Sequence, residues 1–390
     1  AADCEDRCDQ IEREMRDPKA AERFALKQSQ AFVDQMEGFA LELEDELMNF
    51  SDVSYKSFVK SESEIITLFY DKFADIPLLS RMDAVAETFI DEIETLLNRD
   101  LPEEERIPLI EKFRKMYETM DFYVLYNRFL KKEGYQTLPR RPLEKRKLRY
   151  EDVYPVLYLK YRLSQQAERS NIKHLVIDEM QDYSRLQYLI IRRMFSCKMT
   201  ILGDRAQTMA DQQQDVLQFL PGIFGKDLRR IEMRKSYRNT VEIASYAANL
   251  IGVTDLELFE RHGMPVLERD VTDLEAALRE AVDTLFPEEK TYETTAVIVP
   301  DEKTAERAYL ILREILAEKD FDCEKRLSWL NRDSSSFKKG LTVTTFYLAK
   351  GLEFDQVFSI FPKDEKREIM MQAQYIAATR ALHELRVYHI

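Results

Sequence analysis

The 390 residues include 45% hydrophobic and 33% charged side chains, a balance typical of globular proteins that excludes wholesale disorder. The formal net charge of −14 and a pI near 5.1 argue against duplex phosphate binding as the dominant interaction. No apolar run approaches the roughly 18 residues of a membrane span, no signal peptide is recognisable and the four scattered cysteines do not form a disulfide pattern, so we expect a cytoplasmic protein without membrane contact.

Helical periodicity dominates roughly the first third of the chain. Apolar residues recur there at steps of three and four, which places them on one side of a helix. Two such stripes are Phe32, Met36, Phe39, Leu43 and Leu47, and then Met82, Val85, Phe89, Ile93 and Leu96. Charged residues fill the other faces, so this segment predicts a helical bundle or arm.

The helical pattern breaks between residues 131 and 149. Gly134, Pro139 and Pro142 interrupt it, and a run rich in Arg and Lys follows over residues 140–149. A solvated linker and a contact for phosphates or for an acidic partner both fit this run.

An α/β pattern begins after Asp152. Short apolar runs at 175–177 and 199–202 predict buried parallel strands, and further strands are predicted at 296–299, 341–346, 356–361 and 385–388. Helical segments alternate with these strands, and Thr272 with Glu275 three residues later predicts a capping box at the start of one helix. Alternating strands and helices predict open parallel sheets flanked by helices, so the expected fold class is α/β.

Polar residues follow the first two of these strands. Asp178 and Glu179 come directly after the run at 175–177, and Gln207 follows the run at 199–202. Open α/β sheets bind ligands at the carboxyl ends of their strands. A nucleotide-driven motor needs one acid there for Mg²⁺ and another for the attacking water, and an amide such as that of Gln207 could sense a γ-phosphate. By itself, an Asp-Glu pair at a strand end is a weak signal.

Five motifs in this order resemble those of UvrD/Rep-type superfamily 1 helicases. They are DEMQD at 178–182, GDRAQ at 203–207, SYRN at 236–239, AKGLEF at 349–354 and YIAATRA at 375–381. Taken singly, each has a structural explanation: Arg238 or Arg380 would form a surface ion pair, Tyr237 would pack, and Lys350-Gly351 would make a turn. The order and spacing of all five carry the resemblance.

The resemblance implies two RecA-like parallel-sheet domains with ATP and Mg²⁺ between them. On one side, Asp178 and Glu179 would serve the metal and the attacking water, beside Gln207. The other side would be formed by Tyr237, Arg238, Lys350, Gly351, Glu353 and Arg380. Its tyrosine would stack on adenine, its glutamate would approach the ribose, and its two arginines would reach the γ-phosphate.

Within this family the chain resembles the HelD, or helicase IV-like, branch. The resemblance lies in residues 150–163 and in the long helical insertion ahead of them. HelD-like proteins engage bacterial RNA polymerase and use ATP to release it from nucleic acid, so RNA polymerase and DNA are the implied partners. The expected domains are a helical insertion at 1–149, the second part of the first RecA-like domain at 150–232, and a second RecA-like domain at 233–390.

Two departures from the family pattern bear on function. No Gly-x-x-x-x-Gly-Lys-Ser/Thr occurs, so we expect the phosphate-gripping loop upstream, an incomplete first domain, and no activity from these residues alone. Residues 208–212 also lack the aromatic or Arg side chains that stack on single-stranded bases. Three functions therefore stay open: a HelD-like motor, an ordinary 3′–5′ DNA helicase, and a degenerate polymerase-binding scaffold.

Overall fold

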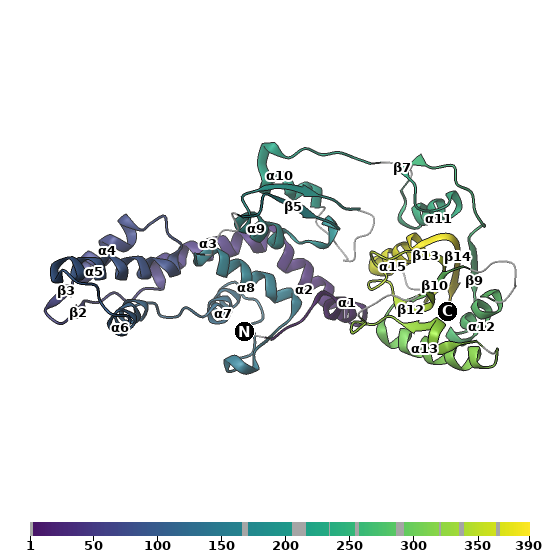
Figure 1. The fold of residues 1–390 in the computed structure, drawn as a ribbon, viewed down its shortest axis with the longest axis horizontal. Helices are drawn as coiled ribbons and strands as arrows, with labels where there is room; N and C mark the ends of the chain where they lie inside the picture. Colours follow the sequence, from purple (N-terminus) through teal and green to yellow (C-terminus); the bar gives the residue numbers. More distant parts are fainter. Residues whose placement is uncertain are drawn as a thin grey trace.

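The computed structural model describes residues 3–165, 171–204, 216–233, 235–253, 257–285, 292–319, 321–334, 339–363 and 367–390. Figure 1 shows an elongated molecule, with a helical arm at one end and a sheet covered by helices at the other. The helices up to residue 163 are α1 (Arg7–Arg16), α2 (Pro18–Gln28), α3 (Gln30–Glu46), α4 (Glu62–Thr67), α5 (Arg81–Leu97), α6 (Glu103–Arg114), α7 (Phe122–Lys132) and α8 (Tyr150–Leu163). Across the described ranges, none of the helices is both long and apolar enough to cross a membrane.

The two predicted apolar stripes form the core of the arm. All of their members are buried except the last, Leu96, which is 71% exposed near the end of α5. The same apolar cluster extends through α8 to Leu186 and Ile190 of α9 (Arg185–Met194). The arm therefore packs directly against α9.

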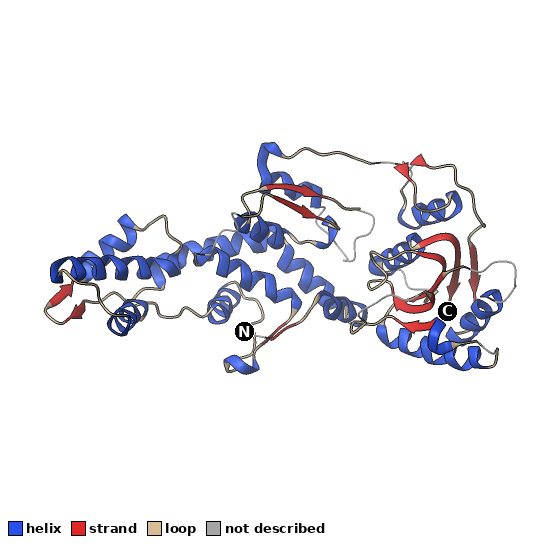
Figure 2. Cartoon of the chain, in the orientation of Figure 1, coloured by secondary structure: helices blue, strands red, loops and turns tan. Residues whose placement is uncertain are grey.

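Short strands interrupt the helical region that the sequence predicted. Strands β2 (Val53–Tyr55) and β3 (Phe58–Lys60) form an antiparallel hairpin at the far end of the arm (Figure 2). At the other end, β1 (Asp3–Cys4) pairs with β4 (Lys147–Leu148) in parallel.

The first sheet pairs β5 (His174–Ile177) with β6 (Lys198–Ile201) in parallel, as predicted. Helices α9 and α10 (Val216–Phe224) pack on one face through Ile177, Tyr188 and Phe219. The prediction that these strands are buried is wrong for the other face, because Val176 is 60% exposed. A strand that alternates buried and exposed residues has only one face covered.

The second sheet has six parallel strands in the order β11-β12-β10-β13-β14-β9. Their bounds are β9 (Leu267–Asp270), β10 (Thr294–Val299), β11 (Leu327–Trp329), β12 (Gly340–Thr345), β13 (Phe354–Phe361) and β14 (Ala381–His389). The predicted strands at 296–299, 341–346, 356–361 and 385–388 fall on four of them. The chain is thus a mixed α/β protein with a six-stranded parallel sheet.

Helices cover both faces of this large sheet. Along β10, Ala296 and Ile298 face a cluster with α11 (Val241–Ile251) and α15 (Glu368–Thr379). The alternate residues Val297 and Val299 face α12 (Leu274–Leu285) and α13 (Glu302–Ala317). The predicted capping box of α12 is wrong: Asp273, not Thr272, caps the helix, because its Oδ1 accepts the Ala276 N–H at 2.9 Å.

The remaining α-helix and the last two strands are short. Helix α14 (Cys323–Arg326) precedes β11, and β7 (Lys235–Ser236) pairs with β8 (Glu257–Leu258) in parallel.

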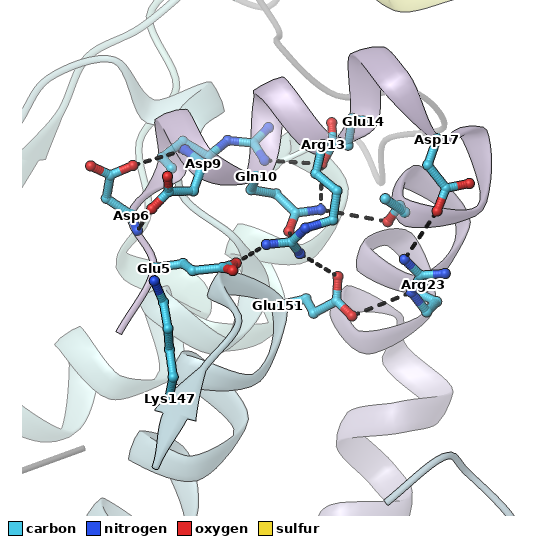
Figure 3. A network of polar contacts seen from close by, with 12 residues as sticks. Glu5, Asp6, Asp9, Gln10, Arg13, Glu14, Asp17, Arg23, Lys147 and Glu151 are labelled. Atoms are coloured by element: carbon cyan, nitrogen blue, oxygen red, sulfur yellow. Dashed lines mark hydrogen bonds and ion pairs between the residues drawn. The ribbon is translucent and has the colours of Figure 1, made fainter. Parts of the chain in front are cut away.

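Helix α1 lies between the arm and the large sheet. One of its sides enters a polar network with α2 and α8, shown in Figure 3, in which buried Glu151 pairs with Arg13 of α1 and Arg23 of α2, each at 3.5 Å. Its other side places Ile11 in the apolar cluster of the large sheet, and the Glu12 carboxylate accepts the Tyr347 hydroxyl at 2.6 Å. Helix α1 therefore joins the two ends of the molecule.

Candidate active site

The acidic turn after β5 has an unusual backbone. Asp178 is exposed, and its Oδ1 accepts the backbone N–H of Glu179 at 2.8 Å. Glu179 adopts φ 53°, a left-handed conformation that costs a non-glycine residue about 1–3 kcal/mol and that is concentrated at functional sites. The turn thereby directs two adjacent carboxylates to the carboxyl end of the strand.

Gln181 fixes this turn against the end of β6. Its Nε2 donates to Glu179 Oε2 at 2.6 Å, and its Oε1 accepts the backbone N–H of Asp204 at 3.0 Å. Gly203 is required for this approach, because a Cβ there would lie 2.4 Å from Met180 Cγ and 2.6 Å from Met180 N. The first two motifs are therefore one packed unit.

Tyr237, Arg238 and Glu353 form an exposed group. The Arg238 Nε lies 2.6 Å from Glu353 Oε1, and both side chains are close to half exposed. The Tyr237 ring is 60% exposed and lies 5.6 Å from the Phe259 ring, centroid to centroid. An exposed aromatic face beside a charged pair offers a stacking surface for a flat ligand.

Lys350 joins the two sheets. It precedes Gly351, whose φ of +83° favours glycine, in the turn between β12 and β13. Its Nζ lies 2.6 Å from both carboxylate oxygens of Asp182 and 3.6 Å from Glu179 Oε2. Burial raises the pKa of Asp182, and the Lys350 ammonium opposes that shift.

Arg380 lies beneath this group, at the C-terminal end of α15. It is 1% exposed, and its guanidinium donates to Ile376 O and Leu352 O, each at 3.3 Å. Burial lowers the pKa of Arg380, the charge of Arg238 adds to that shift, and Glu179 and Glu353 oppose it. Arg380 is thus electrostatically linked to a carboxylate that follows β5 and to one that precedes β13.

A further contact joins Tyr375 of α15 to the segment that follows β6. Its hydroxyl lies 3.5 Å from Asp204 Oδ2, and burial raises its pKa. Gln207, also predicted for this site, lies outside the described residues, as does the segment 208–212.

The carboxylates present here fit a Mg²⁺ ion carried by a nucleotide. Magnesium prefers oxygen ligands, keeps several waters and needs only one or two protein carboxylates when phosphates supply the rest. Asp178 and Glu179 provide that number, and the part of the chain that is described holds no cluster of three metal-ligating side chains. The donor set matches a nucleotide-borne metal rather than a metal held by protein alone.

Sequence reasoning missed two residues of this site. Asp182, the main partner of Lys350, and Gln181 were part of a motif but had no predicted role. Asp182 contacts Lys350, which lies far along the chain, and Gln181 joins Glu179 to Asp204 beyond the next strand, so no local sequence pattern predicts these contacts. The motif spacing was the only available indication.

Comparison with known proteins gives a family for the chain. The UvrD/REP helicase N-terminal domain matches residues 8–209, just over half of the chain. That match includes the Asp178–Glu179 turn and the arm ahead of it. No curated protein sequence matches the chain.

Solved helicase structures are also similar, at low identity. The C-terminal domain of a possible DNA helicase from Lactobacillus plantarum WCFS1 is 24% identical over 40% of this chain and 88% of that one, with a TM-score of 0.31. Arterivirus nonstructural protein 10 (helicase) in complex with DNA is 14% identical over 68% of this chain, with a TM-score of 0.30. The PRRSV helicase is 14% identical over 68% of this chain, with a TM-score of 0.32.

The chain spans 51% and 45% of those two viral proteins, about half of their length. Structural likeness at this level adds no argument, so the assignment rests on the family match over residues 8–209. The chain belongs to the UvrD/REP helicase family.

Proposed function

We propose that this chain is part of an ATP-driven helicase-type motor of the HelD branch, acting on complexes of RNA polymerase and nucleic acid. The motor proposal rests mainly on the contact of Lys350, in the turn between β12 and β13, with Asp182 and Glu179, which follow β5. In this proposal the motifs of both sheets line one cleft, where nucleotide would bind, and the Lys350 contact supports that arrangement.

Each side of the cleft has its own tasks in this proposal. Bound Mg²⁺ supplies positive charge that stabilises the transferring phosphoryl group. Asp178 would hold the metal, and Glu179 would orient the attacking water together with Gln207. Tyr237 stacks on the adenine and Glu353 approaches the ribose.

The two arginines complete this scheme. Arg238 is close to half exposed and pairs with Glu353, whereas the Arg380 guanidinium donates to the end of α15. Both supply positive charge to the γ-phosphate, with Lys350 and Gly351 in the turn beside them.

We further propose the domain limits 1–149, 150–232 and 233–390. The exposed face of β5 and β6 supports an incomplete first domain, because a two-stranded sheet with one bare face is marginal by itself. In this proposal, further strands and the phosphate-gripping loop come from sequence outside these residues.

This arrangement predicts that residues 1–390 alone hydrolyse ATP negligibly. Without a glycine-rich loop and its Lys, the β- and γ-phosphates lose most of their backbone donors. Steady-state turnover by the isolated chain at the rate of an ordinary helicase would contradict the proposal.

The role of Glu179 is tested in the full-length protein by Glu179→Gln. We expect this variant to lose turnover and keep nucleotide binding, because the amide retains the shape of the side chain but not its basicity. Hydrolysis at the parental rate would show that the role assigned to Glu179 is wrong.

The charge of the arm favours a protein partner over a nucleic-acid partner. Between Asp52 and Arg106, acidic side chains far outnumber basic ones. Phosphate backbones are repelled by such a surface, whereas a basic protein groove would accept it. We therefore propose a cytoplasmic protein that binds core RNA polymerase more tightly than it binds free single-stranded DNA.

That preference is tested by measuring both affinities at two salt concentrations. Phosphate-driven binding falls steeply with added salt, so DNA affinity should fall more than polymerase affinity. Tight, salt-resistant DNA binding without polymerase affinity would favour the ordinary DNA helicase, which a strand-displacement assay detects. An intact phosphate loop with turnover in the full-length protein would exclude the degenerate scaffold.

Testing how the arm contributes to polymerase binding requires a deletion that leaves α1 in place. Removing residues 1–149 would also remove Ile11 from the core of the second domain. The backbones of Met48 and Tyr117 form a bridge at the base of the distal arm, so residues 49–116 can be replaced by a short Gly-Ser linker. We expect this deletion to lose polymerase binding and keep ATPase activity. The milder double variant Glu103→Lys/Glu104→Lys, at exposed positions of the tip, should weaken polymerase binding in the same direction.

A further inference from the structure

We propose that Asn239 and Arg261 are positioning residues, which hold Arg238 and Arg380 in fixed register within the second domain. This inference rests on the proposed function, in which both arginines act on the γ-phosphate. It gives a role to Asn239, the last residue of the motif at 236–239, and to Arg261, which lies outside the five motifs.

Asn239 binds the backbone on both sides of Arg380. Its Nδ2 donates to Thr379 O at 3.2 Å and to Ala381 O at 2.6 Å. Asn239 is 8% exposed. It directly follows Arg238 in sequence. One amide therefore fixes the position of both arginines relative to each other.

Arg261 makes a second connection between the same two segments. Its Nη1 donates to Arg238 O at 3.0 Å, and its Nη2 donates to Leu382 O at 3.1 Å. Nη2 also lies 2.8 Å from His383 Nδ1. The backbone of Arg238 is thus joined to the start of β14 by a planar group with fixed donor geometry.

Four consecutive carbonyls around Arg380 accept hydrogen bonds from three separate segments. Thr379 O and Ala381 O accept from Asn239, Leu382 O accepts from Arg261, and Arg380 O accepts the Phe354 N–H at 2.9 Å. Phe354 directly follows Glu353. Backbone held at every carbonyl has little freedom to shift, so Arg380, Arg238 and Glu353 move as one body.

Helix capping does not account for Asn239. The cap of α11 is the next residue, Thr240, whose Oγ1 accepts the Ile243 N–H at 3.4 Å. The amide of Asn239 is therefore not needed to start the helix. Its two donors serve the segment of Arg380 instead.

The test is Asn239→Asp in the full-length protein, because this isosteric change replaces the donor with an acceptor that repels both carbonyls. A displacement of about 1 Å at a catalytic group costs about 100-fold in rate, so we expect kcat for ATP to fall about 10- to 100-fold. Affinity for ADP should stay the same, and affinity for ADP–aluminium fluoride should fall with kcat. The matched control is Asn249→Asp on an exposed position of α11, which should leave kcat unchanged.

A second variant and a second measurement keep the inference testable if Asn239→Asp folds poorly. Arg261→Met removes both donors to the carbonyls and should lower kcat in the same way. In the 390-residue chain itself, both changes should speed amide hydrogen exchange at residues 379–383 without lowering the thermal unfolding midpoint as much as a core substitution does.

The outcomes separate this inference from the proposed function. Wild-type ATPase activity that Arg380→Ala abolishes, but that Asn239→Asp and Arg261→Met leave intact, would overturn the inference alone. A full-length protein with no ATPase activity would overturn the proposed function and this inference with it. Loss of kcat in both variants, with ADP affinity retained, is the result we expect.

Discussion

Replacing Asp182 with Asn should loosen the cleft between the two sheets. The Lys350 Nζ lies 2.6 Å from both oxygens of Asp182, and the Lys350 side chain is only 7% exposed. The variant keeps the shape of the side chain and removes its charge, which leaves Glu179 at 3.6 Å as the remaining anionic partner of Lys350.

The size of the effect follows from the kind of contact. A hydrogen bond between charged groups contributes about 1.5–3 kcal/mol. A factor of ten in an equilibrium constant corresponds to about 1.4 kcal/mol. We therefore expect the ratio of closed to open cleft to fall by about 10- to 150-fold in Asp182→Asn.

The native cysteines provide an assay. Cys197 precedes β6 in the small sheet, and Cys323 begins α14 beside the large sheet. With Cys4→Ser and Cys8→Ser as background, spin labels at these two positions report the distance across the cleft by pulsed electron resonance. The parent should give one dominant distance, and Asp182→Asn should move much of that population to other distances.

A matched control distinguishes the cleft contact from a general loss of charge. The pair Lys319–Asp283 has the same 2.6 Å separation but joins two segments on the same side of the large sheet, Asp283 in α12 and Lys319 just after α13. Asp283→Asn should leave the distance distribution unchanged. An unchanged distribution in Asp182→Asn would refute the reasoning that Lys350 holds the two sheets together.

Three further predictions concern stability. Ile11→Ala should lower the free energy of unfolding by about 2–5 kcal/mol, because Ile11 is 1% exposed in the core of the large sheet. The same variant should speed amide hydrogen exchange in α1, and unchanged exchange would contradict this. Gly203→Ala should cost about 1–3 kcal/mol in thermal or denaturant unfolding, because its Cβ would meet the backbone N of Met180 at 2.6 Å; a parental midpoint would exclude that clash. Hydrogen bonds from His262 and the Gly263 N–H lower the pKa of Glu242 from 4.5 to about 2, so the stability it adds is complete above pH 4.5 and is lost as the pH falls toward 2. The difference in stability between the parent and Glu242→Gln should shrink over that range, and a constant difference would contradict this.

The large sheet could be predicted because its signals are local. Strands β10, β12 and β13 are almost wholly buried, and β10 carries the continuous apolar run at residues 296–299. Strands β12 and β13 mix apolar residues with Thr, Ser, Asp or Gln, and β14 alternates buried and more exposed residues, so their signals are shorter apolar stretches. The apolar stripe from Phe32 to Leu47 was equally clear, since helical spacing repeats over several turns. Both kinds of element follow from the pattern of burial alone.

The hairpin at the end of the arm had no comparable signal. Its turn places Lys56 at φ 53°. Gly or Asn at that position would have predicted a tight turn, but Lys does not. The start of α12 was misplaced by one residue because Thr272 and Asp273 are both good caps, and only the structure shows which one accepts the helix N–H. Competing local choices of this kind are decided by packing.

The candidate site also contains residues that the sequence predicts and contacts that it does not. Asp178 and Glu179 could be predicted because they follow a recognisable strand, and the family match over residues 8–209 agrees with the motif resemblance there. The contacts of Lys350 with Asp182, and of Asn239 with the backbone beside Arg380, join residues far apart in sequence. Contacts between residues so far apart leave no periodic pattern in the sequence, so only the three-dimensional structure reveals them.

The measurement that tests the central claim most directly is ATP hydrolysis by the full-length protein and its Arg380→Ala variant. An arginine finger contributes about 1,000-fold or more to turnover. We predict that the parent hydrolyses ATP, and that Arg380→Ala loses about that factor in kcat with ADP affinity retained. Turnover at the parental rate in Arg380→Ala would contradict the claim that the motifs of the two sheets form one nucleotide cleft.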